Sequence, residues 1–155
     1  MSERICKITL DENSMKKKRS AEAEHERDVA ITDLLDENVF EPKCMKNGPY
    51  KVHLSIADGK LVMDVQSHDD VDKAKVVLSI APLRGVIRDY FMICESYYDA
   101  LKGGGAGKIE AIDMGRRGVH NEGSEAVQNL LKDRILIDFC TARRLFTLIC
   151  VLHIK

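Results

Sequence analysis

The stretch YKVHLSIADGKLVMDV, residues 50–65, predicts a β-hairpin and decides the fold class. Apolar and polar residues alternate over Tyr50–Ile56 and again over Leu61–Val65, which is the pattern of strands with one buried face. Asp58 and Gly59 lie between the two runs, and an Asp-Gly pair at this place favours a tight turn with positive φ angles. We therefore expect two antiparallel strands here.

The remaining elements are predicted outward from this hairpin. Arg4–Leu10 alternates like a strand, and residues 75–80 are a further candidate strand. A helix is expected over Ala21–Asp36, with Asn38 near its end. Strands that come first and helices that follow predict an α+β fold, in which a small antiparallel sheet from the N-terminal half packs against four or five helices, mostly from the C-terminal half.

Most of the C-terminal half carries helical signals. A helix that starts near Pro82 has an apolar stripe at helical spacing and should end in the glycine-rich run 103–107. Residues 135–137 are either a short strand or a buried linker. A last helix, with Thr141 as its N-cap, is apolar on nearly every side and should therefore lie in the middle of the core.

Composition limits the class of protein. The 155 residues suit a single domain covering 1–155, with 45% hydrophobic and 32% charged residues and a net charge of −1. This charge, with only 5% aromatic residues, makes nucleic acid an unfavoured partner. The longest apolar run is about half of the roughly 20 residues that span a bilayer, so no membrane segment is expected. The oligomeric state stays open.

The cysteines and the first residues favour a cytoplasmic location. The chain has five cysteines, an odd number, and none of them form a Cys-x-x-Cys pair, which is typical of reduced thiols. No apolar signal segment is visible at the start. The histidines lack the spacing of a metal site, and the glycine run before Lys108 departs from a phosphate-binding loop. We therefore expect no metal and no cofactor.

The most informative polar stretch is DMGRRGVHNEGS, residues 113–124. A helix over 109–117 is expected to end at Gly118, and another to begin at Asn121 or Ser124. The turn between them would display a cluster of polar groups, because glycine permits close backbone approach and loops commonly carry binding residues. The cluster consists of Arg116, Arg117, His120, Asn121 and Glu122. Pairing of these arginines with nearby carboxylates is the alternative interpretation.

A second anomaly is positive charge at the start of the last helix. Arg143 and Arg144 lie where the helix dipole is positive, which disfavours a cation by a few tenths to about 1 kcal/mol. A compensating anion is expected. It is either internal, with Asp138, Asp89 and Glu95 as candidates, or external, as a bound phosphate or carboxylate or an acidic patch on a protein partner. Glu24, His25 and Arg27, at the start of the first helix, form a secondary candidate surface.

Several strings of the chain resemble a bacterial family, uncharacterised protein family 0262, which is known from alphaproteobacteria. These strings are Glu24–Arg27, Asp89–Tyr98, Ile109–Gly118, His120–Ser124 and Thr141–His153. The resemblance covers essentially the whole chain and implies a bacterial cytosolic protein. It implies no activity, cofactor or catalytic residue.

Two function hypotheses follow from the polar residues. The first is a non-enzymatic interaction or regulatory protein, whose surface is formed by the cluster together with the two arginines of the last helix. The alternative is an enzyme for a small phosphate or carboxylate substrate, with arginines clamping the anion, His120 as acid or base, and Glu122 orienting it. A pocket of several hundred Å3 would favour the enzyme, and a flat patch would favour the interaction protein.

Overall fold

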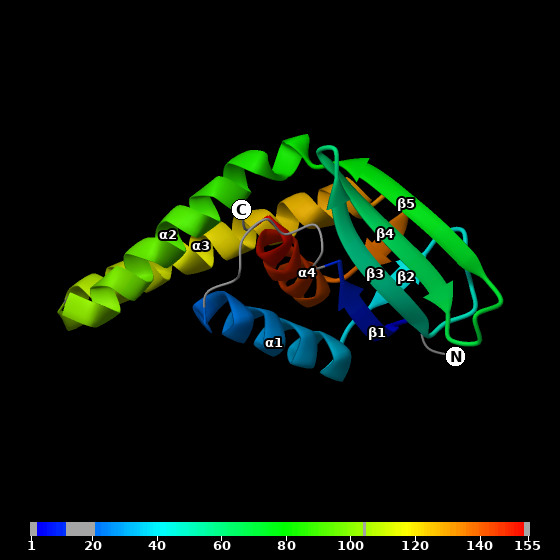
Figure 1. Cartoon of the computed structure of the whole chain (residues 1–155), viewed down its shortest axis with the longest axis horizontal. Helices are drawn as coiled ribbons and strands as arrows, with labels where there is room; N and C mark the ends of the chain where they lie inside the picture. Colours follow the sequence, from blue (N-terminus) through cyan, green and yellow to red (C-terminus); the bar gives the residue numbers. More distant parts are fainter. Residues whose placement is uncertain (1–2, 12–20, 104, 154–155) are drawn as a thin grey trace.

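The computed structural model describes residues 3–11, 21–103 and 105–153, and it confirms the α+β class (Figure 1). In chain order the elements are β1 (Ile5–Leu10), α1 (Ala21–Asp36), β2 (Phe40–Pro42), β3 (Tyr50–Ala57), β4 (Lys60–Ser67), β5 (Lys73–Ser79), the 3-10 turn η2 (Ala81–Leu83), α2 (Arg84–Gly103), α3 (Ala106–Leu131), β6 (Ile135–Ile137) and α4 (Phe139–Leu152). Within these residues, no helix has the length and apolar character needed to cross a bilayer.

The predicted hairpin is confirmed as β3 and β4. These strands pair antiparallel from Tyr50 opposite Ser67 to Ala57 opposite Lys60. The turn residues Asp58 and Gly59 have φ angles of 53° and 72°, which is the positive pair that a tight hairpin turn requires. Inward side chains of both strands are buried and outward ones are partly exposed, so the alternating pattern placed one face of the sheet against the core.

The main sheet is mixed, which corrects the expectation of an antiparallel sheet. Its strand order is β1-β3-β4-β5, and β1 runs parallel to β3. Parallel neighbours need a long crossover connection, and the chain between β1 and β3 includes α1. Local alternation identifies a strand but carries no information on the direction of its neighbour.

A second, two-stranded sheet joins β2 to β6, with Phe40 opposite Ile137. Residues 135–137 are thus a strand, one of the two possibilities that the sequence left open. The three residues of β2 are too few to show alternation. The side chain of Asn38 ties this region together, because it accepts from the Ile5 amide at 2.7 Å and donates to the Leu34 carbonyl at 2.7 Å.

Helix α3 is continuous over 26 residues, which corrects the predicted break at Gly118 and restart at Asn121 or Ser124. Gly123 allows α3 to pack closely against α4. A Cβ on Gly123 would lie 2.5 Å from ring carbons of Phe146 on α4, whereas a Cβ on Gly118 would meet nothing within 4 Å. The glycine-rich run does separate α2 from α3, as expected.

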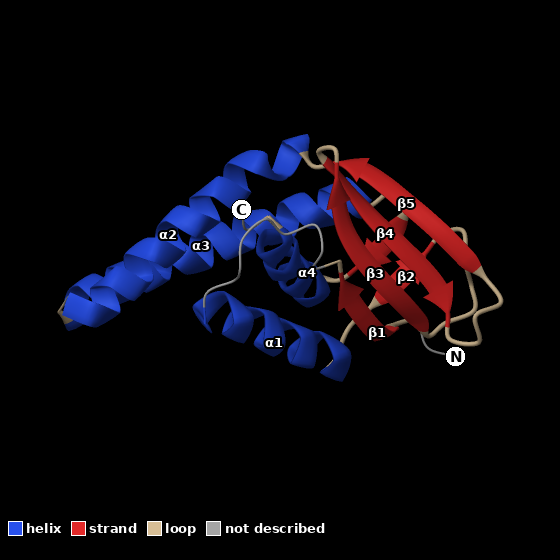
Figure 2. Cartoon of the chain, viewed as in Figure 1, coloured by secondary structure: helices blue, strands red, loops and turns tan. Residues whose placement is uncertain are grey.

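Helix α4 lies at the centre of the helical layer and contacts α1, α3 and β3 (Figure 2). Leu145, Phe146 and Cys150 are at most 1% exposed, which confirms the expected central position. The N-cap is Asp138, whose carboxylate accepts from the Thr141 amide at 2.9 Å. The prediction of Thr141 as the cap is therefore wrong. Its hydroxyl instead accepts a hydrogen bond from the backbone amide of Val39, just before β2.

Candidate functional site

A cavity of about 360 Å3 opens between α1, α3 and α4. Its lining residues are Glu26, Val29, Ala30 and Asp33 from α1, Arg116 and His120 from α3, and Cys140, Arg143, Arg144 and Thr147 from α4. The structure therefore brings together the two separate anomalies of the sequence, the polar stretch and the arginines of the last helix. All three helices contribute polar groups, and the α1 wall adds apolar contact.

The predicted polar cluster divides between two faces of α3. Arg116 and His120 are four residues apart and share the face that lines the cavity. Arg117 pairs with Asp113 at 3.0 Å and its side chain is 70% exposed. The remaining two members of the predicted cluster, Asn121 and Glu122, are exposed as well. The cluster was expected on a turn, and the helix separates its members because one residue corresponds to a rotation of about 100°.

Arg116 is already neutralised by a carboxylate of α1. Its guanidinium forms an ion pair with Glu26 and lies over the ring of Tyr97, 4.9 Å from the ring centroid. The hydroxyl of Tyr98 donates to the same Glu26 carboxylate at 3.2 Å. Burial, followed by the charge and hydrogen bond of Glu26, raises the pKa of Tyr98 to about 12. This network connects α1 to the α2–α3 pair beside the cavity.

Arg143 and Arg144 have no carboxylate partner among the described residues. Arg144 donates from Nη1 to the Cys140 carbonyl at 3.0 Å, and its Nε is buried without a hydrogen bond. Asp138, an internal candidate, is engaged as the cap of α4. The α2 carboxylates Asp89 and Glu95 make no ion pair with either arginine in the described part of the chain. The Asp138 carboxylate thus caps this helix start, whereas the two guanidinium groups form no ion pair within the described residues.

His120 is 6% exposed and lies edge-on to two aromatic rings. Its ring centroid is 5.1 Å from that of Tyr90 and 6.1 Å from that of Phe146. Burial, and then the charges of Arg143 and Arg116, lower the pKa of His120 to about 4. The ring is therefore neutral at physiological pH, and its Nδ1 is buried without a hydrogen bond in the described structure.

Glu122 and the secondary candidate surface both lie outside the cavity. Glu122 does not orient the ring, because it is exposed and because Nδ1 has no partner among the described residues. The secondary surface of Glu24, His25 and Arg27 does not line the cavity, whereas their neighbour Glu26 does. Sequence reasoning missed Glu26, although a signal was present: it lies one helical turn before Ala30, on the apolar side of α1.

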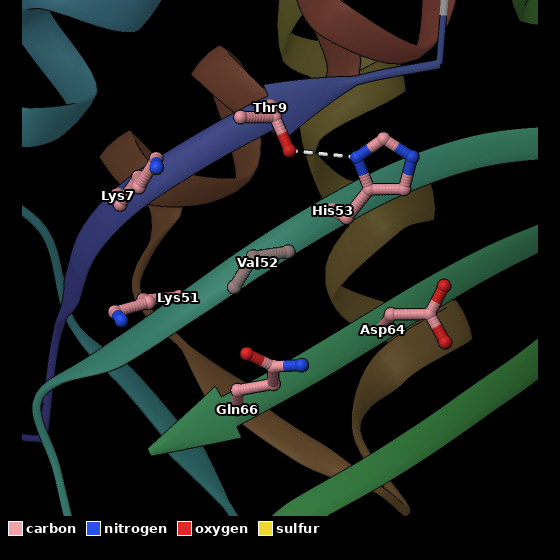
Figure 3. A pocket seen from close by; sticks show the side chains of 7 residues that line it. All are labelled: Lys7, Thr9, Lys51, Val52, His53, Asp64 and Gln66. Atoms are coloured by element: carbon pink, nitrogen blue, oxygen red, sulfur yellow. Dashed lines mark hydrogen bonds between the residues drawn. The ribbon is translucent and has the colours of Figure 1, made fainter. Parts of the chain in front are cut away.

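A shallower pocket of about 180 Å3 lies on the outer face of the main sheet (Figure 3). Its lining residues are Lys7, Thr9, Lys51, Val52, His53, Asp64 and Gln66. The Thr9 hydroxyl and His53 Nδ1 are 2.6 Å apart and form a hydrogen bond. The cavity between the helices contains three buried nitrogens without a hydrogen bond, on Arg116, His120 and Arg144. Among the described residues that line the sheet pocket, no buried side-chain nitrogen or oxygen lacks a hydrogen bond. The helical cavity is therefore the stronger candidate site.

The described residues contain no group of three histidine, cysteine, aspartate or glutamate side chains that could hold a metal ion. The cavity instead offers three guanidinium groups, two carboxylates, a neutral imidazole, a thiol and a hydroxyl. Guanidinium groups bind phosphate and carboxylate through paired hydrogen bonds, and the imidazole adds one hydrogen-bonding nitrogen. The chemistry of the cavity therefore suits an anionic organic molecule.

Comparison with known proteins gives consistent matches over the whole chain. The model of the uncharacterised protein family UPF0262 matches residues 2–155. UPF0262 proteins of Agrobacterium fabrum and Rhizobium meliloti are 49% and 50% identical over 150 residues, which is 97% of this chain and 94% of each relative. The UPF0262 protein of Brucella canis is 51% identical over 151 residues, 97% of this chain and 93% of that protein. No solved structure gives a significant match.

Proposed function

The chain belongs to the uncharacterised protein family UPF0262, and we propose that it is a non-enzymatic regulatory protein of the cytoplasm that binds a small phosphate- or carboxylate-bearing molecule. The binding site is the cavity between α1, α3 and α4. The observation that carries the proposal is the pair Arg143 and Arg144, which face this cavity without a carboxylate partner among the described residues.

The charge of the cavity favours an anion. Three arginines and two carboxylates line it, and its histidine is neutral, so the formal charge is positive. Glu26 neutralises Arg116, which leaves the excess positive charge on the α4 wall. The start of α4 lies at the same wall, and because the Asp138 carboxylate caps it, the excess positive charge there is that of the two guanidinium groups. An anion bound there would pair with these guanidinium groups.

The state of His120 favours binding over catalysis. A histidine with a pKa of about 4 is a weak base at neutral pH, and no carboxylate of the described residues orients its ring. As a neutral group it can still donate or accept one hydrogen bond with a ligand. The enzyme hypothesis keeps one supporting observation, the concave site, whose volume of about 360 Å3 is in the range of substrate pockets.

The test compares an Arg143→Ala, Arg144→Ala double variant with the control Arg117→Ala. Arg117 belongs to the predicted polar cluster, but it lies outside the cavity, where its exposed side chain pairs with Asp113. Thermal unfolding would be followed with inorganic phosphate, phosphate monoesters and dicarboxylates, and hits confirmed by calorimetry. At a concentration of 100 times Kd, a ligand stabilises by about 2.7 kcal/mol, which corresponds to a rise in Tm of roughly 5–10 °C.

Wild type and the control should show this rise, and the double variant should lose it. If no anion shifts Tm, or if the double variant responds like wild type, the proposal is wrong. Conversion of a panel compound that stops in a His120→Ala variant would establish the enzyme hypothesis instead. Each variant is first checked for native circular dichroism.

A regulatory protein also needs a surface for its output. Arg117, Asn121 and Glu122 are exposed on α3, next to the turns that carry Arg116 and His120. This surface is our candidate contact for a protein partner. Affinity purification with the Arg117→Ala, Asn121→Ala, Glu122→Ala variant should lose a partner that the wild type recovers. Recovery of the same proteins by both would exclude this surface.

A further inference from the structure

We propose that Cys140 is a modification site, a thiol that forms a mixed disulfide with small anionic disulfides, and that the arginines of the cavity select them. This inference rests on the proposed anion-binding function of the cavity. The chemical class of the reagent is a low-molecular-weight disulfide that carries carboxylates and ammonium groups, for which glutathione disulfide is the natural probe.

Cys140 combines exposure with a position on the cavity wall. All five cysteines are free, and Cys6, Cys44 and Cys140 are exposed. Of these, Cys140 lines the cavity. Cys150 is fully buried, and this burial raises the pKa of its thiol, which makes it inert in the folded protein.

The neighbours of Cys140 provide the selection. Cys140 is the second residue of α4, so Arg143 and Arg144 follow it by three and four positions on the same side of the helix. Arg144 Nη1 binds the Cys140 carbonyl at 3.0 Å, which holds the guanidinium against this turn. Two guanidinium groups thus lie on the same side of the helix as the thiol, where they would attract a carboxylate of the incoming disulfide.

Two further groups of the cavity point to a ligand with both charges. His120 is buried, lines the cavity, and leaves Nδ1 without a hydrogen bond in the described structure, so a polar ligand would satisfy it. Asp33 lies on the α1 wall and makes no ion pair with the arginines of the α4 wall. Each half of glutathione disulfide has two carboxylates and one ammonium, which match these two walls.

The reaction is thiol–disulfide exchange. The Cys140 thiol gives its proton to solvent, and the thiolate attacks one sulfur of the disulfide. A bond forms between that sulfur and Sγ, the original sulfur–sulfur bond breaks, and the other half leaves as a thiolate. One disulfide is consumed and one is formed, so no further oxidant or reductant is needed.

The experiment uses two disulfides of opposite charge, glutathione disulfide and cystamine, with the wild-type full chain. Peptide mass spectrometry follows the rate at each exposed cysteine. The ratio of the two rates cancels the intrinsic reactivity of each thiol. Cys6 and Cys44 are internal controls, because each is exposed and has a lysine as a sequence neighbour. At Cys140, the ratio of anionic to cationic rates should be about tenfold higher than at the controls.

The high ratio should fall to that of the controls in the Arg143→Ala, Arg144→Ala variant and remain in Arg117→Ala. A second measurement, on the wild type alone, guards against misfolding of the variant: raising the salt concentration should bring the ratio toward the control value. Equal ratios at Cys140 and Cys44, while phosphate still stabilises the protein, would overturn this inference and leave the proposed function intact. Absence of both effects would overturn both.

Discussion

Replacement of two glycines of α3 by alanine should have opposite effects on stability. Gly118→Ala places a methyl group in open space, and alanine is a better helix former than glycine by about 1 kcal/mol. We therefore expect Gly118→Ala to stabilise the protein by up to about 1 kcal/mol. Gly123→Ala has the same gain in helix propensity, so the pair is matched apart from packing.

The packing cost at position 123 follows from the distances to Phe146. The added Cβ would lie 2.5 to 2.6 Å from three ring carbons, against about 3.5–4.0 Å for an ordinary contact. The ring is fully buried and cannot swing into solvent, so α3 and α4 must separate by about 1 Å. Overpacking of this kind costs roughly 1–3 kcal/mol, and the gain in propensity offsets about 1 kcal/mol of it.

Urea unfolding followed by circular dichroism measures both effects. The net loss for Gly123→Ala should lie between about 0 and 2 kcal/mol, so this variant should be roughly 1–3 kcal/mol less stable than Gly118→Ala, and Tm should change by roughly 2–4 °C for each kcal/mol in a protein of this size. Destabilisation by Gly118→Ala would refute the continuous helix, because it would indicate the glycine-dependent turn that the sequence suggested. Stabilisation of Gly123→Ala equal to that of Gly118→Ala would refute the close approach of α3 to α4.

Three further outcomes are expected. His120 has a pKa of about 4 in the folded protein and about 6.5 in the unfolded chain, so the folded state binds fewer protons between these pH values. The free energy of unfolding should therefore fall by up to about 3 kcal/mol as the pH is lowered from 6.5 to 4. In urea titrations, His120→Gln should remove this dependence on pH. Glu26→Gln should cost about 2 kcal/mol in the same assay, because its ion pair is only 20% exposed, whereas Asp113→Asn at an exposed pair should cost under about 0.5 kcal/mol. Asn38→Leu leaves the Ile5 amide unsatisfied, which should cost about 1–3 kcal/mol and speed hydrogen exchange of that amide.

The elements that the sequence predicted well have local signals. The turn of the hairpin needs only two residues with positive φ between alternating runs, and α1 spans the predicted residues 21–36. The break predicted in α3 followed from the low helix propensity of Gly118 and Gly123. Packing of α3 between α2 and α4 overrides that preference.

The candidate site was predicted in part. Charge anomalies identified Arg116, His120, Arg143 and Arg144, because cations at a helix start and a polar run are visible in any sequence. They did not show that Arg116 lines the cavity while Arg117 faces solvent. That difference depends on which face of a helix each residue occupies, and the sequence predicted a turn here. Glu26 was missed because its value lies in its contact with Arg116, 90 positions away.

The sequence by itself determined the α+β class, the hairpin at residues 50–65 and the polar residue types of the candidate site. These properties depend on periodicity, turn chemistry and charge, which act over a few neighbouring residues. Only the tertiary structure decided the parallel pairing of β1, the continuity of α3 and the meeting of three helices around one cavity. These depend on contacts between segments that lie far apart in the chain, where packing energy exceeds local preference.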